Sequence, residues 1–208
     1  KQSNEKLAQG FNCIKMKIGA INFEEEIRCI AHIREKGGDN IIIRVDANGA
    51  FGKEDVMGKL KALAKFNVHS IEQPVPVGQH QLMQHLCRES PVPIALDEEL
   101  IGHFKHKQEL LEELHPQAII LKPTLLGGFR ETAEWIDLAE KMNIKWWVTS
   151  ALESNIGLNA IAQFTGNYPN LLHQGLGTGQ LYENNFTSPL NIKNGEIYYD
   201  KTLNWELN

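Results

Sequence analysis

Six polar residues of this chain follow apolar runs at nearly equal intervals. The steps between them are 29, 26, 25, 25 and 28 residues, and the six are Lys17, Asp46, Glu72, Asp97, Lys122 and Ser150. Each run has the length of a buried strand, and a segment with the apolar spacing of a helix follows it. Repetition of strand, polar residue and helix predicts a parallel sheet with crossover helices.

Seven segments are predicted to be strands, and six helices are predicted to follow them. The strands are residues 13–18, 41–46, 70–73, 94–97, 118–122, 146–150 and 171–175. The helices are residues 23–35, 53–66, 80–88, 105–114, 129–142 and 156–164. An open doubly wound sheet would spread the six polar residues along an edge, whereas a closed barrel brings them to one mouth. We therefore predict an α/β fold of the (β/α) barrel class.

A barrel of this class has eight strands, so one strand is unaccounted for. Residues 4–9 have helical composition and end at a glycine, a suitable C-cap, directly before the first predicted strand. We expect the missing strand to lie upstream. Near the other end, Asn194-Gly195 predicts a hairpin turn. We expect residues 1–187 to form the partial barrel and residues 188–208 to pack outside it.

Composition argues against several classes of partner. The net charge of −5 and the pI near 5.9 give no basic face for nucleic acid, and acidic and basic residues are interspersed. No run approaches the roughly 18 apolar residues of a membrane helix, and the first residues lack the apolar region of a signal peptide. Three cysteines without a CxxC spacing argue against a disulfide framework. We expect a cytoplasmic protein that acts on a small molecule.

Three carboxylates occupy successive places in the series of strand ends, namely Asp46, Glu72 and Asp97. Hard divalent cations prefer oxygen ligands, and three carboxylates leave coordination positions open for water and substrate. We predict that these three residues bind a divalent metal ion. Glu98 follows Asp97 and is the alternative to it as the third ligand.

Lysines form the second half of the pattern. Lys15 and Lys17 are two residues apart on a strand, so both side chains point into the barrel mouth. A neighbouring cation and partial desolvation lower the pKa of a lysine, so we predict Lys17 as general base and Lys15 as the neighbour that tunes it. Lys122 leaves a strand half a barrel away and faces Lys17 across the mouth.

A metal ion that binds a carboxylate, with a base beside it, predicts abstraction of the proton α to that carboxylate. The ion and Lys122 would stabilise the resulting enolate. A Schiff-base aldolase would also use a strand-end lysine such as Lys122, but it would not need three aligned carboxylates.

Five motifs carry a resemblance to a known family. They are KMK at 15–17, VDANGAF at 45–51, IEQP at 71–74, ALDEE at 95–99 and LKPTLLGG at 121–128. In this order they resemble the enolase superfamily, in its muconate-lactonizing-enzyme-like branch. Within that branch, TSALESNIGLNAIAQ at 149–163 and GLGTGQLYENN at 175–185 are most similar to the o-succinylbenzoate synthase family.

The resemblance implies a fold and a reaction. The fold would be the modified (β/α)7β barrel of the superfamily, here with strands two to eight and without the capping domain and first strand. The reaction would be dehydration of 2-succinyl-6-hydroxy-2,4-cyclohexadiene-1-carboxylate to 2-succinylbenzoate, in menaquinone biosynthesis.

By the same resemblance, each site residue has an expected role. Asp46, Glu72 and Asp97 would bind Mg²⁺, with Mn²⁺ as the alternative. Lys17 would take the α proton and return it to the leaving hydroxide, Lys122 would steady the enediolate, and Lys15 would lie by the substrate carboxylate. The residues expected to face the succinyl arm of the substrate are Ser150, Gly175, Gly177 and Thr178.

Two other functions stay open. A dipeptide epimerase or N-acylamino-acid racemase of the same branch would use Lys17 and Lys122 as opposed acid and base. Such epimerases usually carry a DxD near the last strand, where this chain has GLGTGQL, which favours the dehydratase. Because the capping domain and one strand are missing, a non-catalytic metal-binding barrel fragment is the second alternative. The oligomeric state is left open.

Overall fold

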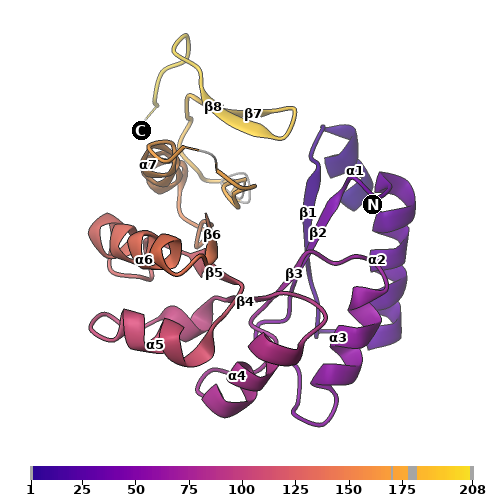
Figure 1. The fold of residues 1–208 in the computed structure, drawn as a ribbon. Coiled ribbons are helices and arrows are strands. Elements are labelled where there is room, and N and C mark those ends of the chain that lie inside the picture. The colour runs from indigo at the N-terminus through magenta and orange to yellow at the C-terminus, as the bar shows by residue number, and fades with distance from the viewer. Residues whose placement is uncertain (1, 170, 178–181, 207–208) are drawn as a thin grey trace.

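A six-stranded parallel sheet forms the centre of the molecule, and each strand pairs with the next one in the sequence (Figure 1). The computed structural model describes residues 2–169, 171–177 and 182–206. The strands are β1 Cys13–Lys17, β2 Ile42–Asp46, β3 Ser70–Glu72, β4 Ile94–Leu96, β5 Ala118–Leu121 and β6 Lys145–Val148. The helices are α1 Gln2–Ala8, α2 Phe23–Gly37, α3 Val56–Ala64, α4 His80–Glu89, α5 Lys107–Leu114, α6 Phe129–Lys141 and α7 Asn155–Thr165.

The sheet curves into an open half-barrel. In Figure 1 the strands β1 to β6 follow an arc, and the helices α2 to α6 lie on its outer side. Parallel strands joined by right-handed crossovers place every connecting helix on the same face of the sheet. The other face is the inner side of the arc, where the polar residues at the strand ends lie. The prediction of an incomplete (β/α) barrel is confirmed.

The strand predicted at residues 171–175 is wrong in extent. All five residues are described, and among them only Gly175 pairs, through an isolated parallel bridge to Thr149. The Gln174 side chain explains this, because its Oε1 accepts a hydrogen bond of 2.7 Å from the Val148 amide. The Val148 amide thus donates to a side-chain oxygen of Gln174 and not to a backbone carbonyl of a paired strand.

Two apolar clusters fill the two faces of the sheet. The large one lies between the sheet and the outer helices and includes the fully buried Ile43, Leu60 and Ile71. The small one lies on the inner face and consists of Ala95, Ala118, Ile120 and Trp147. Alternation along each strand sends neighbouring side chains to opposite clusters, which leaves the strand ends for polar residues.

Local hydrogen bonds shift several element ends from their predicted places. The helix predicted at 53–66 begins at Val56, because Asp55 Oδ1 accepts from the Gly52 amide at 3.1 Å and holds a turn there. The strand predicted at 94–97 ends at Leu96, and a short 3-10 helix, η1 Glu98–Leu100, follows Asp97. No helix in the described part of the chain is long and apolar enough to span a membrane.

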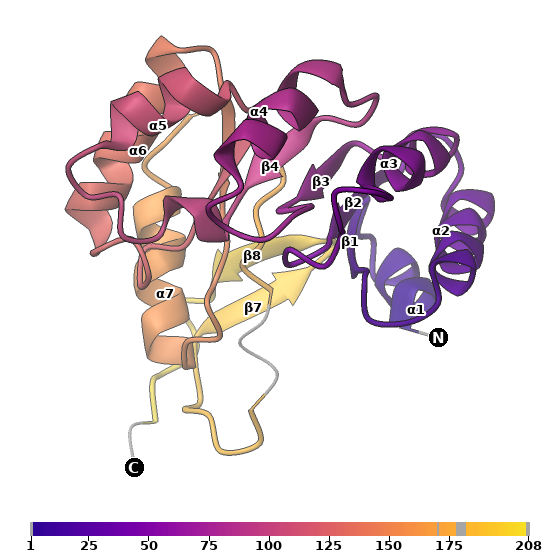
Figure 2. The same ribbon diagram turned by 90° about the horizontal axis from the view of Figure 1, so that it is seen from below.

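The predicted hairpin is present as β7 Leu190–Lys193 and β8 Glu196–Tyr199, around Asn194 and Gly195, both at positive φ. It lies on the open side of the arc, between α7 and the loop before β1 (Figures 1 and 2). A Cβ added to Gly195 would be 3.0 Å from the Gly10 carbonyl oxygen, so the turn sits against that loop. Separation of residues 188–208 from the barrel stays a prediction.

Candidate active site at the strand ends

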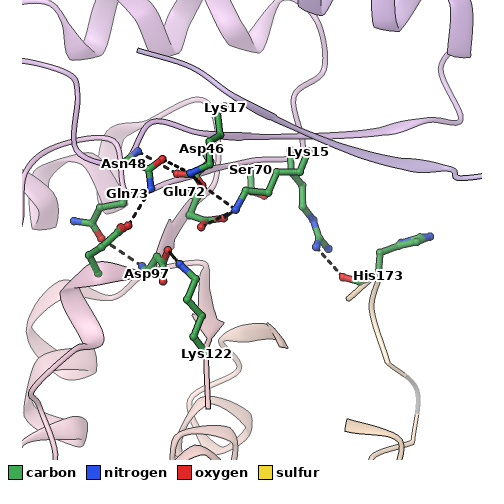
Figure 3. Close-up of polar contacts among 12 residues, drawn as sticks. Lys15, Lys17, Asp46, Asn48, Ser70, Glu72, Gln73, Asp97, Lys122 and His173 are labelled. Atoms are coloured by element: carbon green, nitrogen blue, oxygen red, sulfur yellow. Dashed lines mark hydrogen bonds and ion pairs between the residues drawn. The ribbon is translucent and has the colours of Figure 1, made fainter. Parts of the chain in front are cut away.

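The pairing register brings the predicted functional residues to one level of the half-barrel. Lys17 of β1 pairs with Asp46 of β2, and Asp46 pairs with Glu72 of β3. Asp97 directly follows β4 and Lys122 directly follows β5. Their side chains lie together at the carboxyl ends of the strands (Figure 3). The equal spacing in the sequence therefore corresponds to convergence in space for five of the six polar residues.

Lysine side chains lie directly against the three carboxylates. The Lys15 ammonium is 2.8 Å from both Asp46 Oδ2 and Glu72 Oε2, and Lys122 donates to Asp97 Oδ2. Lys17 lies 3.5 Å from Asp46 Oδ2. Both β1 lysines therefore reach the same carboxylate, as expected for residues two apart on a strand.

The carboxylates are buried, whereas Lys17 is open to solvent. The exposed fractions of Asp46, Glu72 and Asp97 are 1%, 3% and 2%. The Lys17 side chain is 71% exposed, so the partial desolvation expected for it is absent from this structure. The physical reason is that Lys17 is the last residue of β1 and extends over the rim toward Asn48.

Burial and charge set the protonation of this layer. Burial raises the pKa of Glu72 to about 8; the Lys15 ammonium opposes this rise and the Asp46 and Asp97 carboxylates add to it. Burial also acts to raise the pKa of Asp46, but Lys15 and then Lys17 outweigh it and hold that pKa below its usual value. The lysines thus stabilise the ionised form of Asp46 more than that of Glu72.

Asp46, Glu72 and Asp97 offer the oxygen donors that a divalent metal ion prefers, but their oxygens are not arranged around a common point. In the described ranges, no group of three or more His, Cys, Asp or Glu side chains is arranged to hold a metal ion. The ammonium groups of Lys15 and Lys122 stand against the carboxylate oxygens. Assignment of Asp46, Glu72 and Asp97 as metal ligands stays a prediction.

The residues expected to face the substrate's succinyl arm fall into three situations. Ser150 donates its amide hydrogen to the Gly175 carbonyl at 3.1 Å, so these two lie together beyond β6. A Cβ on Gly175 would come within 2.6 Å of Thr149 Cγ2, which explains the glycine. Gly177 faces the hairpin, because a Cβ there would be 3.8 Å from Ile192 Cδ1. Thr178 lies outside the described residues. Their substrate role stays a prediction.

Sequence reasoning missed Asn48, which lies beside Lys17. Asn48 Oδ1 accepts a 2.6 Å hydrogen bond from Lys17, and Asn48 Nδ2 donates to Glu98 Oε1 at 2.9 Å. Glu98, the alternative third ligand, is thus engaged by an amide. A signal was present, since Asn48 precedes a glycine just after a strand, where asparagine often adopts positive φ; its φ is 43°.

The missed Gln73 ties together the loops that follow β3 and β4. Its Oε1 accepts from the amides of Asp97 and Glu99 at 3.3 Å, and its Nε2 donates to Glu99 Oε2 at 2.9 Å. Glu99 is 1% exposed and also accepts from the Gly78 amide. This buried network fixes the backbone that follows Glu72 and the backbone from Asp97 to Glu99.

The fold and this site define a class, and comparison with known proteins gives the same class. Residues 1–202 match the family model described as enolase C-terminal domain-like, so the chain belongs to that family. The enolase-type barrel and the muconate-lactonizing-enzyme-like branch predicted from the motifs are thereby confirmed. Members of the superfamily typically use a divalent metal ion.

Individual relatives within this family are named for specific enzymes. The chain is 51% identical over 196 residues to the o-succinylbenzoate synthase of Desulfotalea psychrophila, covering 93% of this chain and 53% of the relative. The crystal structure of MenC from the same organism superposes with a TM-score of 0.88 at 49% identity, over 94% of this chain and 55% of that one. An N-succinyl-L-Arg/Lys racemase of Bacillus cereus is 29% identical over 74% of this chain and 42% of its own length. The chain thus spans about half the length of the relatives it matches.

Proposed function

We propose that this chain carries the catalytic barrel of an o-succinylbenzoate synthase. The reaction is the dehydration of 2-succinyl-6-hydroxy-2,4-cyclohexadiene-1-carboxylate, a small carboxylate, to 2-succinylbenzoate in menaquinone biosynthesis. The observation that carries the proposal is the 51% identity to such an enzyme over almost the whole chain. The convergence of Lys17 and Lys122 on a layer of buried carboxylates supports it, because this reaction removes a proton α to a carboxylate.

The donor set fits a divalent cation, Mg²⁺ or Mn²⁺, held by Asp46, Glu72 and Asp97. These are three buried oxygen donors on neighbouring strand ends, and burial raises the pKa of Glu72 to about 8 even though the Lys15 ammonium opposes the rise. When bound, the ion would supply positive charge that stabilises a carboxylate substrate and its enediolate.

The chain's own residues account for the proton transfers. Lys17, in its neutral form, takes the α proton as the carbon–hydrogen bond breaks. The carbon–oxygen bond to the leaving hydroxide then breaks, and the Lys17 ammonium returns the proton to it, so the products are water and the aromatic ring. Lys122 faces this centre from β5 and stabilises the negative charge with its ammonium group. Lys15 lies between Asp46 and Glu72 and is placed to attract the substrate carboxylate.

The test is turnover of the cyclohexadiene substrate by the protein in its full native length, with Mg²⁺, followed by chromatography of 2-succinylbenzoate. Lys17→Ala is expected to lower kcat by more than about 10⁴-fold, beyond the effect of an assisting group, because Lys17 is the sole proposed base. A rate retained in Lys17→Ala would reject the assigned base. No turnover by the wild-type protein would reject the proposed function.

A racemase of N-succinyl amino acids is the second candidate. The arrangement that favours it is the pair Lys17 and Lys122, which approach the carboxylate layer from strands four apart, as two-base proton exchange requires. Incubation of N-succinyl-L-arginine in D₂O separates the two candidates, since a racemase incorporates deuterium at the α carbon. Binding of Mg²⁺ without either activity would point to a non-catalytic metal-binding domain.

A further inference from the structure

The shorter of the two polar contacts described for the proposed base is with a neutral acceptor. The Lys17 ammonium donates to Asn48 Oδ1 at 2.6 Å, while its distance to Asp46 Oδ2 is 3.5 Å. Its side chain is 71% exposed, so packing does little to fix its four-carbon stem. A lysine loses much rotamer freedom when its ammonium is held in one place. The Asn48 amide is therefore the group that selects the position of the Lys17 ammonium.

Asn48 is itself fixed at the backbone. Its φ of 43° is one that asparagine tolerates, and its amide hydrogen goes to Asp46 Oδ1 at 3.1 Å. The next amide, of Gly49, donates to the Gln73 carbonyl at 2.7 Å. The backbone that carries the Asn48 side chain is thus fixed by hydrogen bonds on both sides. The side chain can still rotate so that its amide oxygen and nitrogen exchange places.

Glu98 removes that freedom. Asn48 Nδ2 donates to Glu98 Oε1 at 2.9 Å, and a carboxylate accepts hydrogen bonds but cannot donate them. The amide nitrogen must therefore face Glu98 and the oxygen must face Lys17. The second oxygen of Glu98, Oε2, is buried and has no hydrogen-bond partner among the described residues. Asn48 is thus the side-chain donor that engages this carboxylate.

We propose that Glu98 and Asn48 are positioning residues for the base, with Glu98 orienting the Asn48 amide so that its oxygen holds Lys17 at the barrel mouth. Figure 3 shows Asn48 beside Lys17. This rests on the proposed function, which makes Lys17 the base. It assigns Glu98 a role distinct from metal binding. Neither residue is proposed to touch the substrate.

Three variants separate the roles. Glu98→Leu removes the acceptor, so the Asn48 amide is free to turn its nitrogen toward Lys17. Glu98→Gln keeps a side-chain carbonyl that can accept from Asn48 Nδ2. Asn48→Gly removes the amide at a backbone conformation that glycine adopts without strain. The matched control is Asn143→Gly, which makes the same change at a φ of 57° in the loop between α6 and β6.

The first readout does not depend on the substrate. Acetylation of Lys17 by acetic anhydride, scored by mass spectrometry against the exposed Lys36, measures how firmly the ammonium is held. Loss of a hydrogen bond to a charged group is expected to raise the Lys17 labelling rate about tenfold in Glu98→Leu and in Asn48→Gly. Glu98→Gln and Asn143→Gly are expected to match the wild type. Unchanged labelling in Glu98→Leu and Asn48→Gly would overturn the proposal.

The second readout is kinetic, combined with Mg²⁺ binding by calorimetry. A misplaced base slows the chemical step, so kcat is expected to fall about 10- to 100-fold in Glu98→Leu, with KM and the Mg²⁺ Kd within about twofold of wild type. Weaker Mg²⁺ binding with unchanged Lys17 labelling would overturn the proposal and make Glu98 a metal ligand. If the wild-type protein does not turn over the substrate, the proposed function fails, and the labelling still decides the positioning role.

Discussion

The Arg44 guanidinium stacks on the Trp147 ring, 3.7 Å from its centroid, across the interior of the half-barrel. Arg44 belongs to β2 and Trp147 to β6, four strands further along the sheet. Arg44 also donates to the His173 carbonyl at 2.8 Å. The pair therefore joins the two sides of the arc and the segment before Gly175 beneath the carboxylate layer.

Arg44→Met is expected to lower the free energy of unfolding by about 2 to 3 kcal/mol, because a buried cation–π contact and a charge-assisted hydrogen bond are lost. Urea denaturation measures the change. Arg28→Met is the control, because the Arg28 side chain is 68% exposed and its ion pair with Glu25, at 3.4 Å, lies at the surface. This substitution is expected to change the free energy of unfolding by less than about 0.5 kcal/mol. Equal effects of the two substitutions would contradict the role of Arg44.

Arg34 is expected to be the most sensitive arginine on the outer side. Its guanidinium donates to four backbone carbonyls, of Phe66, Gly38, Ile41 and Asn67, at 2.7 to 3.1 Å. A lysine cannot reproduce this planar set of donors, so Arg34→Lys should cost about 2 kcal/mol and lower the Tm. Arg130→Lys, at a side chain 86% exposed, is the matched control. A Tm unchanged in Arg34→Lys would show that water replaces these bonds.

His69 contributes a fall in stability on acidification, while Glu72, whose pKa is raised to about 8, acts in the opposite direction between about pH 8 and pH 4.5. Burial, with the positive charges of Arg44, Lys145 and His173, lowers its pKa to about 4 from the usual 6.5. The unfolded state therefore binds the proton first, so the contribution is complete above about pH 6.5 and is lost as the pH falls to about 4. We expect the contribution of His69 to fall by on the order of 2 kcal/mol over this window, after allowance for partial exposure.

The measurement for His69 is the free energy of unfolding between pH 7 and pH 4. The difference in unfolding free energy between the wild type and His69→Gln should shrink by this amount from pH 7 to pH 4. The difference between the wild type and His85→Gln, at an exposed helical position, should not change with pH. If both variants keep the wild-type slope, another group governs the acid limb.

Removal of a proposed metal ligand should weaken Mg²⁺ binding. Asp46→Asn is expected to weaken Mg²⁺ binding by more than about 100-fold, beyond the 10- to 100-fold typical of groups behind the ligands. Calorimetry with Mg²⁺ alone measures it, and chelation by EDTA should abolish turnover in the wild type. Asp55→Asn is the control, because Asp55 pairs with Lys59 at the surface. Equal Mg²⁺ affinity in Asp46→Asn and wild type would remove Asp46 from the site.

The positions of the main site residues could be predicted because they follow from the period of the fold. One polar residue at each strand end is a local signal, and a parallel sheet brings such residues to one edge whatever the details of packing. Lys17, Asp46, Glu72, Asp97 and Lys122 accordingly lie where the spacing indicates. The hairpin was predictable for a similar reason, since Asn194-Gly195 favours its turn locally.

The features that could not be predicted depend on side chains meeting across the fold. The hydrogen bond from Asn48 to Glu98 joins residues 50 positions apart, and no local pattern encodes it. The exposure of Lys17 depends on how its stem leaves the rim, which strand periodicity does not specify. The short pairing at Gly175 results from the Gln174 side chain, an alternative that polar residues near strand ends often provide.

The seating of the hairpin turn on the loop at Gly10 sets an order of assembly. Strands β1 to β6 each pair with the next one in the chain, so the arc can grow as the polypeptide leaves the ribosome. The contact between Gly195 and Gly10 joins residues that are far apart in the sequence, and it can form only after the hairpin has been synthesised. Until then the open side of the arc lacks the hairpin that lies on it in the folded structure (Figures 1 and 2).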